Sequence, residues 1–230
     1  MIKQLLLGNG NEIEIRRLTD KNLNEIQSLQ RRVIEALTTD SFLQPLSDEE
    51  FLFILNGKGL MIGAYYNDKL IAFRAMLEPE LDDEHLGKDA GLPRSEWPLM
   101  LYSEITNVDS SFQGNRLQVL LGEIIMSEVD KKRFRYICAT VAPFNIASLK
   151  DKFVHGLQIV SLKVKYGDLL RYIFIKDVRC SLEKSASLEI RHILMGNTAE
   201  QQQLLQNGWI GTEINKVNDE WFVCFERREN

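Results

Sequence analysis

Between Glu104 and Leu157 the chain carries polar residues whose spacing suits the binding of an anion. The expected strand LYSEITNVD is followed by SSFQGN and then by RLQVLLGEIIMSEVD, in which leucine and isoleucine recur at helical spacing. A turn that leads into a helix offers backbone N–H groups without partners and the positive end of the helix dipole. Gly114 would let a phosphate approach the backbone closely. The segment therefore predicts an anion site at a strand–turn–helix junction.

Glu104, four residues before Val108, is the best-placed candidate for acid–base chemistry. To act as a base near neutral pH, this carboxylate needs a pKa that partial burial has raised. The alternative is a charged residue at an open strand edge. Tyr102 has the same strand parity, although a half-buried aromatic residue on a strand more often belongs to the core. Cys138, within YICATVA, is predicted to be a small buried hydrophobe rather than a nucleophile.

Hydrophobic periodicity predicts the elements that must position these residues. Apolar spacing, capping residues and turn residues give the order β-α-α-β-β-β-α-β-α-β-β up to Val178, an α/β (α+β) fold in which helices lie on the faces of a mixed sheet. The expected elements are the strand EIEIRRL, a helix from Thr19 to Ala36, a helix opened by the capping box at Ser47, the hairpin GLMIGAYY–LIAFRAML, the strand and helix around Gly114, the strand YICATVA, a helix that Gly156 ends, and the hairpin SLKVKY–LLRYIFIKDV.

Residues 78–98 break this pattern with three prolines and a run of acids, and they are predicted to form a long loop. The acids would attract a cationic amine, or would simply make the loop a solvated one.

After Val178 the composition becomes more polar, and we assign residues 1–178 to one domain and 179–230 to a small β-rich α/β extension. The extension contains LEIRHIL, a helix from Thr198 to Asn207, and the strands WIGTEI and WFVCFER. The alternating WFVCFER strand would pair with a second copy in a homodimer or cap a pocket. No internal repeat is visible in the sequence.

Composition limits the classes of function. The chain has 230 residues and a net charge of −5, which argues against a nucleic-acid or anionic-membrane partner. Three widely spaced cysteines do not form a disulfide framework, and no Cys/His spacing indicates a metal site. The start, MIKQLLLGNG, has too short an apolar run for a signal peptide or a membrane span, so the cytoplasm is the expected compartment.

From Val108 to Gly156 the sequence resembles the GNAT N-acetyltransferase superfamily. The family's cofactor loop, Gln/Arg-x-x-Gly-x-Gly/Ala, follows a valine that ends a strand, and here Val108 precedes Gln113-Gly-Asn-Arg-Leu-Gln118. The family's Asn-x-x-Ser…Gly pattern is present as Asn145-Ile-Ala-Ser148 and Gly156. The resemblance implies a mostly antiparallel GNAT sheet and an acetyl-CoA co-substrate, with no metal. It also implies a primary amine on a small molecule or peptide as the acceptor, attacked directly in a ternary complex.

The resemblance also assigns roles to residues. Glu104 would be the catalytic base, and the strand edge at Thr106, Asn107 and Val108 would pair with the pantetheine arm. The phosphates would lie on the loop, and Asn145 would meet the pantetheine through its amide. The loop residues implied in cofactor binding are Gln113, Gly114, Asn115, Arg116, Leu117 and Gln118.

Three residues depart from the family's pattern. Arg116 and Gln118 stand where small residues are common, and Arg116 would point outward or add a charge-assisted bond to a phosphate. Lys152 stands where the family often has a tyrosine acid, and lysine donates a proton poorly at its usual pKa. These departures leave open an alternative, a GNAT-fold module that binds CoA without catalysis and has a regulatory or structural role.

Overall fold

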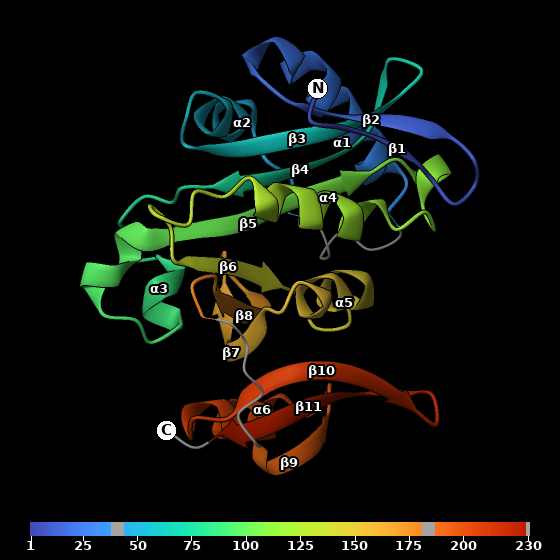
Figure 1. Ribbon diagram of the computed structural model, residues 1–230. Helices are drawn as coiled ribbons and strands as arrows, with labels where there is room; N and C mark the ends of the chain where they lie inside the picture. The colour runs from blue at the N-terminus through green and yellow to red at the C-terminus, as the bar shows by residue number, and fades with distance from the viewer. Residues whose placement is uncertain (38–43, 181–186, 229–230) are drawn as a thin grey trace. The chain divides into compact units, whose positions relative to one another are not determined.

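The computed structural model describes residues 1–37, 44–180 and 187–228. The chain divides into two compact units, Met1–Pro79 with Leu101–Val129, and Glu80–Met100 with Asp130–Asn230. Figure 1 shows the course of the chain through both.

The first unit is a five-stranded sheet in which the strands follow the order β1-β2-β3-β4-β5 and every neighbouring pair is antiparallel. The elements are β1 (Lys3–Leu6), β2 (Glu12–Arg17), η1 (Asp20–Asn22), α1 (Leu23–Glu35), α2 (Asp48–Leu55), β3 (Gly59–Tyr66), β4 (Lys69–Leu77), β5 (Met100–Val108), η4 (Ser110–Phe112) and α4 (Leu117–Ser127).

Local sequence explains several of these boundaries. Ser47 opens α2, because its hydroxyl accepts a hydrogen bond from Glu50 N while the Glu50 carboxylate accepts one from Ser47 N. Asn67 and Asp68 join β3 to β4 with φ values of 48° and 58°, the left-handed pair that a two-residue type I′ hairpin requires.

Helices α1 and α2 cover one face of this sheet, and α4 covers the other (Figure 1). The α1–α2 face carries the main apolar core, in which Phe51 and Phe73 pack edge to face with ring centroids 5.9 Å apart. The α4 face holds Arg74 of β4, whose side chain is fully buried. Arg74 Nη1 donates to Gln118 O at 3.0 Å and Nη2 donates to Ser103 Oγ at 3.0 Å, so the guanidinium joins β4, β5 and the first turn of α4.

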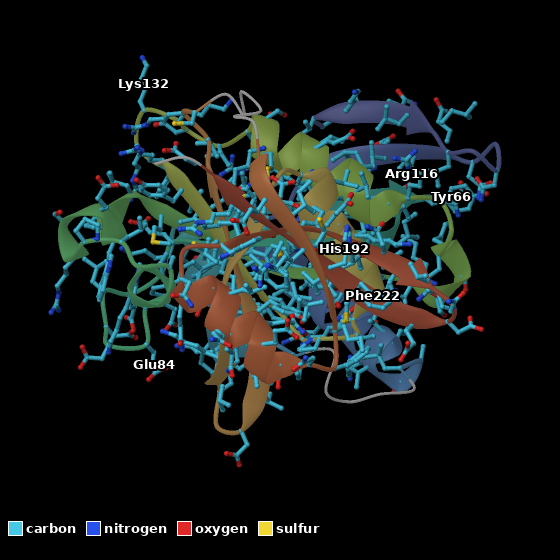
Figure 2. All side chains as sticks on the ribbon, turned by 90° about the horizontal axis from the view of Figure 1, so that it is seen from below. Tyr66, Glu84, Arg116, Lys132, His192 and Phe222 are labelled. Carbon is cyan, nitrogen blue, oxygen red and sulfur yellow. The ribbon has the colours of Figure 1, made fainter. Side chains whose placement is uncertain are left out.

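The second unit contains an antiparallel sheet in the order β6-β8-β7-β10-β11-β9. His192 on β9 and Phe222 on β11 share one face of it, as Figure 2 shows. The elements are α3 (Leu86–Asp89), η3 (Arg94–Leu99), β6 (Tyr136–Val141), α5 (Ile146–Val154), β7 (Gln158–Lys165), β8 (Leu169–Asp177), β9 (Ser187–Leu194), α6 (Thr198–Gln206), β10 (Ile210–Val217) and β11 (Glu220–Arg228).

The predicted element order and α/β fold class are confirmed, with two differences. Strand β1 was not predicted from the sequence, because its short, mostly exposed segment shows no alternation; among the described strands it pairs with β2 alone. The predicted loop 78–98 contains the short helices α3 and η3. His85 organises this segment, since its Nδ1 accepts a hydrogen bond from Gly87 N and its ring stacks on Trp97 at 4.7 Å.

Replacing Arg74 tests whether its guanidinium holds the first unit together. We expect Arg74→Met to lower the free energy of unfolding by about 3 kcal/mol, because it leaves the buried Ser103 hydroxyl and the partly buried Gln118 carbonyl without this donor. Arg16→Met is the matched control, since Arg16 is partly exposed and its surface ion pairs contribute less than about 1 kcal/mol. Urea denaturation measures both changes, and equal losses would contradict the assignment.

Candidate functional site

Glu104 lies at a β-bulge in β5. Ile105 pairs with Ala75 and Ser103 pairs with the next residue of β4, Met76, so Glu104 is the extra residue on β5. A bulge breaks the ladder locally and redirects the side chain of the added residue. The strand therefore sets Glu104 apart from the regular alternation of β5.

The environment of Glu104 suits a base that works near neutral pH. Burial raises the pKa of its carboxyl to about 7, and the negative charge of Glu50 adds to the shift. The direction of this shift is the one that a base at position 104 was expected to require. A carboxylate with this pKa is mostly ionised just above neutrality and returns a proton readily.

Asp109 fixes the turn that follows β5. The side chain is buried, and its carboxylate accepts hydrogen bonds from Ser111 N at 3.1 Å and Arg32 Nε at 3.1 Å. Burial alone would raise the pKa of Asp109, but these two donors and the charge of Lys69 outweigh it and lower the pKa below its ordinary value. The carboxylate is thus charged and held, and it ties the start of the turn to α1.

The turn itself contains two residues in the left-handed region. Gly114 has φ 81° and Arg116 has φ 56°, and Arg116 is the N-cap of α4. Asn115 Nδ2 donates to Phe112 O at 3.1 Å and closes the loop from inside. A left-handed N-cap suits glycine better than arginine, which gives a physical reason for the small residues that the GNAT loop pattern has here. Arg116 is exposed, and it is labelled in Figure 2.

The backbone of this turn presents a row of free donors. Among the described residues, none accepts a hydrogen bond from the backbone N–H groups of residues 114–119, and the first regular bond of the helix runs from Leu120 N to Arg116 O at 2.9 Å. Consecutive free N–H groups and the positive end of an eleven-residue helix attract an anion. These donors are of the kind that the predicted anion cradle requires, and the binding of an anion here stays a prediction.

The three strand residues before the turn differ in environment. Thr106 pairs with Arg74 in the β4–β5 ladder, and Val108 pairs with Ala72. Asn107 pairs with Phe73 and is fully buried, and neither polar atom of its amide has a hydrogen-bond partner among the described residues. Within the first unit β5 is the last strand of the sheet, so one edge of its backbone is not used by β4. Pairing of that edge with a pantetheine arm stays a prediction.

Asn145 lies in the second unit, where it is the N-cap of α5. Its side-chain oxygen accepts a hydrogen bond from Ser148 N at 3.3 Å. Glu104 and the residues from Thr106 to Gln118 thus share one unit, and Asn145 belongs to the other.

Lys152, at the position where a tyrosine acid is common in GNAT enzymes, is buried in α5. Its Nζ lies 2.9 Å from Asp151 Oδ2, and His155 Nε2 lies 3.3 Å from Asp151 Oδ1. Cys138 is completely buried, as expected of a small hydrophobe, and burial raises the pKa of its thiol well above the ordinary value.

Glu84, one of the acids in the segment 78–98, is bound to a lysine. Lys165 Nζ donates to Glu84 Oε2 at 2.8 Å and lies 3.0 Å from Asp89 Oδ2. The hydrogen bond with Lys165 lowers the pKa of Glu84. Glu84 is therefore already paired within the chain.

Sequence reasoning missed Asp109, Arg32 and Arg74. The role of Asp109 could have been predicted from its neighbours, because an aspartate before Ser-Ser favours a turn that its side chain caps. Arg74 could also have been singled out, as the one charge inside the apolar run LIAFRAML. Arg32 lies on a helix far from the turn in sequence, and no local pattern indicates its contact with Asp109.

Within residues 1–37, 44–180 and 187–228, His, Cys, Asp and Glu side chains form no group of three or more that would hold a metal ion. In the same part of the chain, no helix combines the length and hydropathy that crossing a membrane requires.

Solved structures of N-acetyltransferases superpose on this chain. An N-acetyltransferase from Staphylococcus aureus Mu50 superposes with a TM-score of 0.55 at 17% identity, covering 72% of this chain and 98% of its own. The ribosomal-protein-S18-alanine N-acetyltransferase of Escherichia coli gives 0.55 at 16% identity, covering 75% and 97%. The chain has the GNAT fold.

A third GNAT-fold structure, the PaiA N-acetyltransferase from Thermoplasma acidophilum in complex with coenzyme A, gives a TM-score of 0.50 at 14% identity and covers 72% of this chain and 98% of its own. The three solved chains are matched almost end to end, whereas the present chain has residues beyond the match. No protein-family model and no curated protein sequence matches this chain.

Substitution at Arg116 tests the strain in the GNAT loop. We expect Arg116→Gly to raise the free energy of unfolding by about 1 kcal/mol, because glycine adopts a positive φ without steric cost. Arg116→Ala is the control, since it removes the guanidinium but keeps the strained backbone, and its stability should stay near that of the wild type. Thermal and urea denaturation compare the two; an equal effect of both variants would show that the backbone is not strained.

Proposed function

We propose that this GNAT-fold chain is an N-acetyltransferase that transfers the acetyl group of acetyl-CoA to a primary amine. The observation that carries the proposal is the row of backbone N–H groups from Gly114 to Val119 at the start of α4, six donors that have no acceptor among the residues the structure describes. Acetyl-CoA has a pyrophosphate that such a row would bind. The GNAT fold supports the assignment independently.

Different residues of the chain would bind different parts of acetyl-CoA. Residues 114–118 would hold the pyrophosphate through backbone N–H groups, with Gln113 at the start of the loop, and the exposed Arg116 guanidinium would add a charge-assisted bond. The backbone of β5 at residues 106–108 would pair with the amides of the pantetheine arm, as an added strand does. Asn145 would contribute its amide from the start of α5.

Glu104 supplies the acid–base chemistry in this proposal. An amine attacks a thioester only as the free base, so a proton must leave its nitrogen before or during attack. Glu104 would take this proton, directly or through a water molecule. The amine nitrogen then bonds to the acetyl carbon, the carbon–sulfur bond breaks, and CoA leaves as a thiolate. No covalent bond to the enzyme forms.

Protonation of the thiolate does not require a dedicated acid on the enzyme. Lys152 is buried, and its Nζ lies 2.9 Å from Asp151 Oδ2. A thiolate is a tolerable leaving group, because free thiols ionise within a few units of neutral pH. We therefore assign no acid role to Lys152.

The acceptor is a primary amine on a small molecule or a peptide. The Escherichia coli neighbour is named for an alanine of a ribosomal protein, which makes a peptide amine one candidate class. We propose the cytoplasm as the compartment, because Cys138, Cys180 and Cys224 are free thiols.

CoA binding is the first test. We expect CoA at about 100 times its Kd to stabilise the protein by about 2.7 kcal/mol, or several degrees of melting temperature. Arg116→Gly should weaken CoA binding about tenfold through loss of a charge-assisted bond. Differential scanning fluorimetry and calorimetry measure both effects. No shift of the wild type at millimolar CoA would refute the proposal.

Glu104→Gln tests the proposed base. We expect a loss of turnover of about 100-fold or more with nearly unchanged CoA affinity. In the wild type, kcat/KM for the amine should rise with pH through a midpoint near the Glu104 pKa of about 7, and the variant should lose this limb. Steady-state kinetics from pH 5 to 9 supply the profile. An unchanged turnover would remove Glu104 from the mechanism.

The same variant has a predicted effect on stability. Folded Glu104 keeps its proton up to about pH 7, whereas the unfolded chain releases it near 4.5, so the stability of the wild type falls as pH rises through this window. Glu104→Gln carries no such cost and should be more stable than the wild type by about 3 kcal/mol at pH 8 and equally stable at pH 4. A stability difference that does not vary with pH would contradict the raised pKa.

The alternative function is a CoA-binding module without catalysis. The Lys152–Asp151 pair, in place of a tyrosine, is the observation that favours it. CoA binding with no release of thiol across a broad panel of amines would support this alternative over the enzyme.

A further inference from the structure

The segment from β9 to β11 repeats the segment from β6 to β8. Each runs strand, helix, strand, strand, and each forms a sheet in which its first strand pairs with its third and its third pairs with its second. No internal repeat is visible in the amino-acid sequence, but the structure contains one.

The equivalence extends to single residues. Asn145 and Asn197 cap the two helices with nearly equal backbone angles, φ −76° and ψ 72° against φ −84° and ψ 70°. Each asparagine side chain accepts a hydrogen bond from the backbone N–H three residues later. Each helix is closed at the same distance by a glycine with positive φ, Gly156 at 75° and Gly208 at 80°.

The second strand of each copy is also irregular at the same place. The register shifts between Ile159 and Ser161 in β7 and between Gly211 and Glu213 in β10. The two copies meet where Ile159 pairs with its own equivalent, Gly211. A Cβ at Gly211 would lie 2.9 Å from the Ile159 Cβ, so only glycine fits this junction.

Helix packing is reciprocal across this junction. Helix α5 contacts β10, and α6 contacts β7, its counterpart. Gln202 Nε2 of α6 donates to Leu162 O of β7 at 3.0 Å. Equivalent residues of the two copies pair antiparallel, and the helix of each copy packs on the second strand of the other. The two copies are therefore related by a pseudo-two-fold axis.

The second copy does not bring a second anion cradle. In the first copy, β6 follows the β5–α4 junction, whereas β9 begins at Ser187, only ten residues after β8 ends at Asp177. Asn197 therefore has no counterpart of residues 113–118 before it. The contribution of the second copy to the site must come from its contacts.

Met195 of the second copy makes the contact that matters for the Asn145 turn. Phe144 N donates to Met195 Sδ at 3.1 Å. Pro143 and Phe144 occupy the central positions of a turn closed by Asn145 N donating to Ala142 O at 3.2 Å. Phe144 has φ 65° at the third position, where such a turn normally has glycine. Phe144, the strained residue directly before Asn145, is thus hydrogen-bonded to Met195 of the second copy.

Met195 is itself firmly placed. It is fully buried, its N–H donates to Trp221 O at 2.8 Å, and its carbonyl accepts from Gln201 Nε2 at 2.8 Å. The buried Gln201 accepts a hydrogen bond in turn from the Tyr172 hydroxyl at 2.7 Å. A second contact between the two copies is a cation–π interaction, in which Lys150 Nζ of α5 lies 5.2 Å from the centroid of the Trp221 ring.

We propose that the second copy, residues 187–228, is a positioning device, and that Met195 holds the strained Phe144 turn so that Asn145 is presented to the pantetheine arm. The inference rests on the proposed acetyl-CoA site and gives the C-terminal segment a role in it. Met195 is a positioning residue, since it acts through Phe144 and not on the substrate.

Met195→Leu tests the proposal, because leucine keeps most of the volume and removes the sulfur acceptor. We expect KM for acetyl-CoA and the Kd of CoA to rise about tenfold, with kcat changed less than twofold. Met61→Leu, the same change at a buried methionine of β3, is the matched control and should alter neither constant.

A second-site variant separates positioning from general damage. Glycine adopts the turn without strain, so Phe144→Gly combined with Met195→Leu should recover most of the CoA affinity. Amide hydrogen exchange at residue 144, measured without any ligand, should be faster in Met195→Leu and unchanged in Met61→Leu.

The outcomes distinguish this inference from the proposed function. Wild-type protein that binds no CoA overturns the function and the role of Met195 with it. Wild-type binding with an unchanged Kd in Met195→Leu overturns the positioning role alone. A weakened variant that Phe144→Gly does not rescue also overturns it, because the defect would then not lie in the turn.

Discussion

Buried charge at the junction between β5 and α4 is the constraint on which the site depends. Arg74 supports the junction from the sheet, with its guanidinium bonded to Ser103 and to the Gln118 carbonyl in the first turn of the helix. Asp109 supports it from the loop side through Arg32. Both charges are costly to bury unless their partners stay in place, so the loop between them has little freedom. A preorganised loop can leave its N–H groups free for a ligand, since it does not need them for its own stability.

The two turns assigned to the cofactor share a physical feature. Each places a residue with a large side chain in the left-handed region just before a helix, Arg116 before α4 and Phe144 before Asn145 and α5. Such conformations persist only where the surroundings over-determine them, and they concentrate at functional sites. The surroundings differ in the two units: Asp109 and Arg74 flank the first turn, whereas a repeated module contacts the second through Met195.

The sequence predicted those elements whose conformation depends on residues close together in the chain. The capping box at Ser47, the Asn67–Asp68 hairpin and the helix between Asn145 and Gly156 follow from a few neighbouring residues, and the structure contains all three. The bulge at Glu104 depends on the register with β4, and the burial of Arg74 depends on α4, so neither could be derived locally. The repeat escaped notice because the two helix segments share only Asn145 with Asn197, Ala147 with Ala199 and Gly156 with Gly208. The domain boundary at residue 178 and the cofactor roles themselves stay predictions.

The most direct test of the account is to follow the backbone amides of the protein by heteronuclear NMR while CoA is added. The account predicts that the largest chemical-shift changes fall on Gly114 to Val119, whose N–H groups have no partner in the described chain. Smaller changes are expected near Asn145. Saturable binding with no change at residues 114–119, or no binding at millimolar CoA, would contradict the central claim that this turn is a pyrophosphate site.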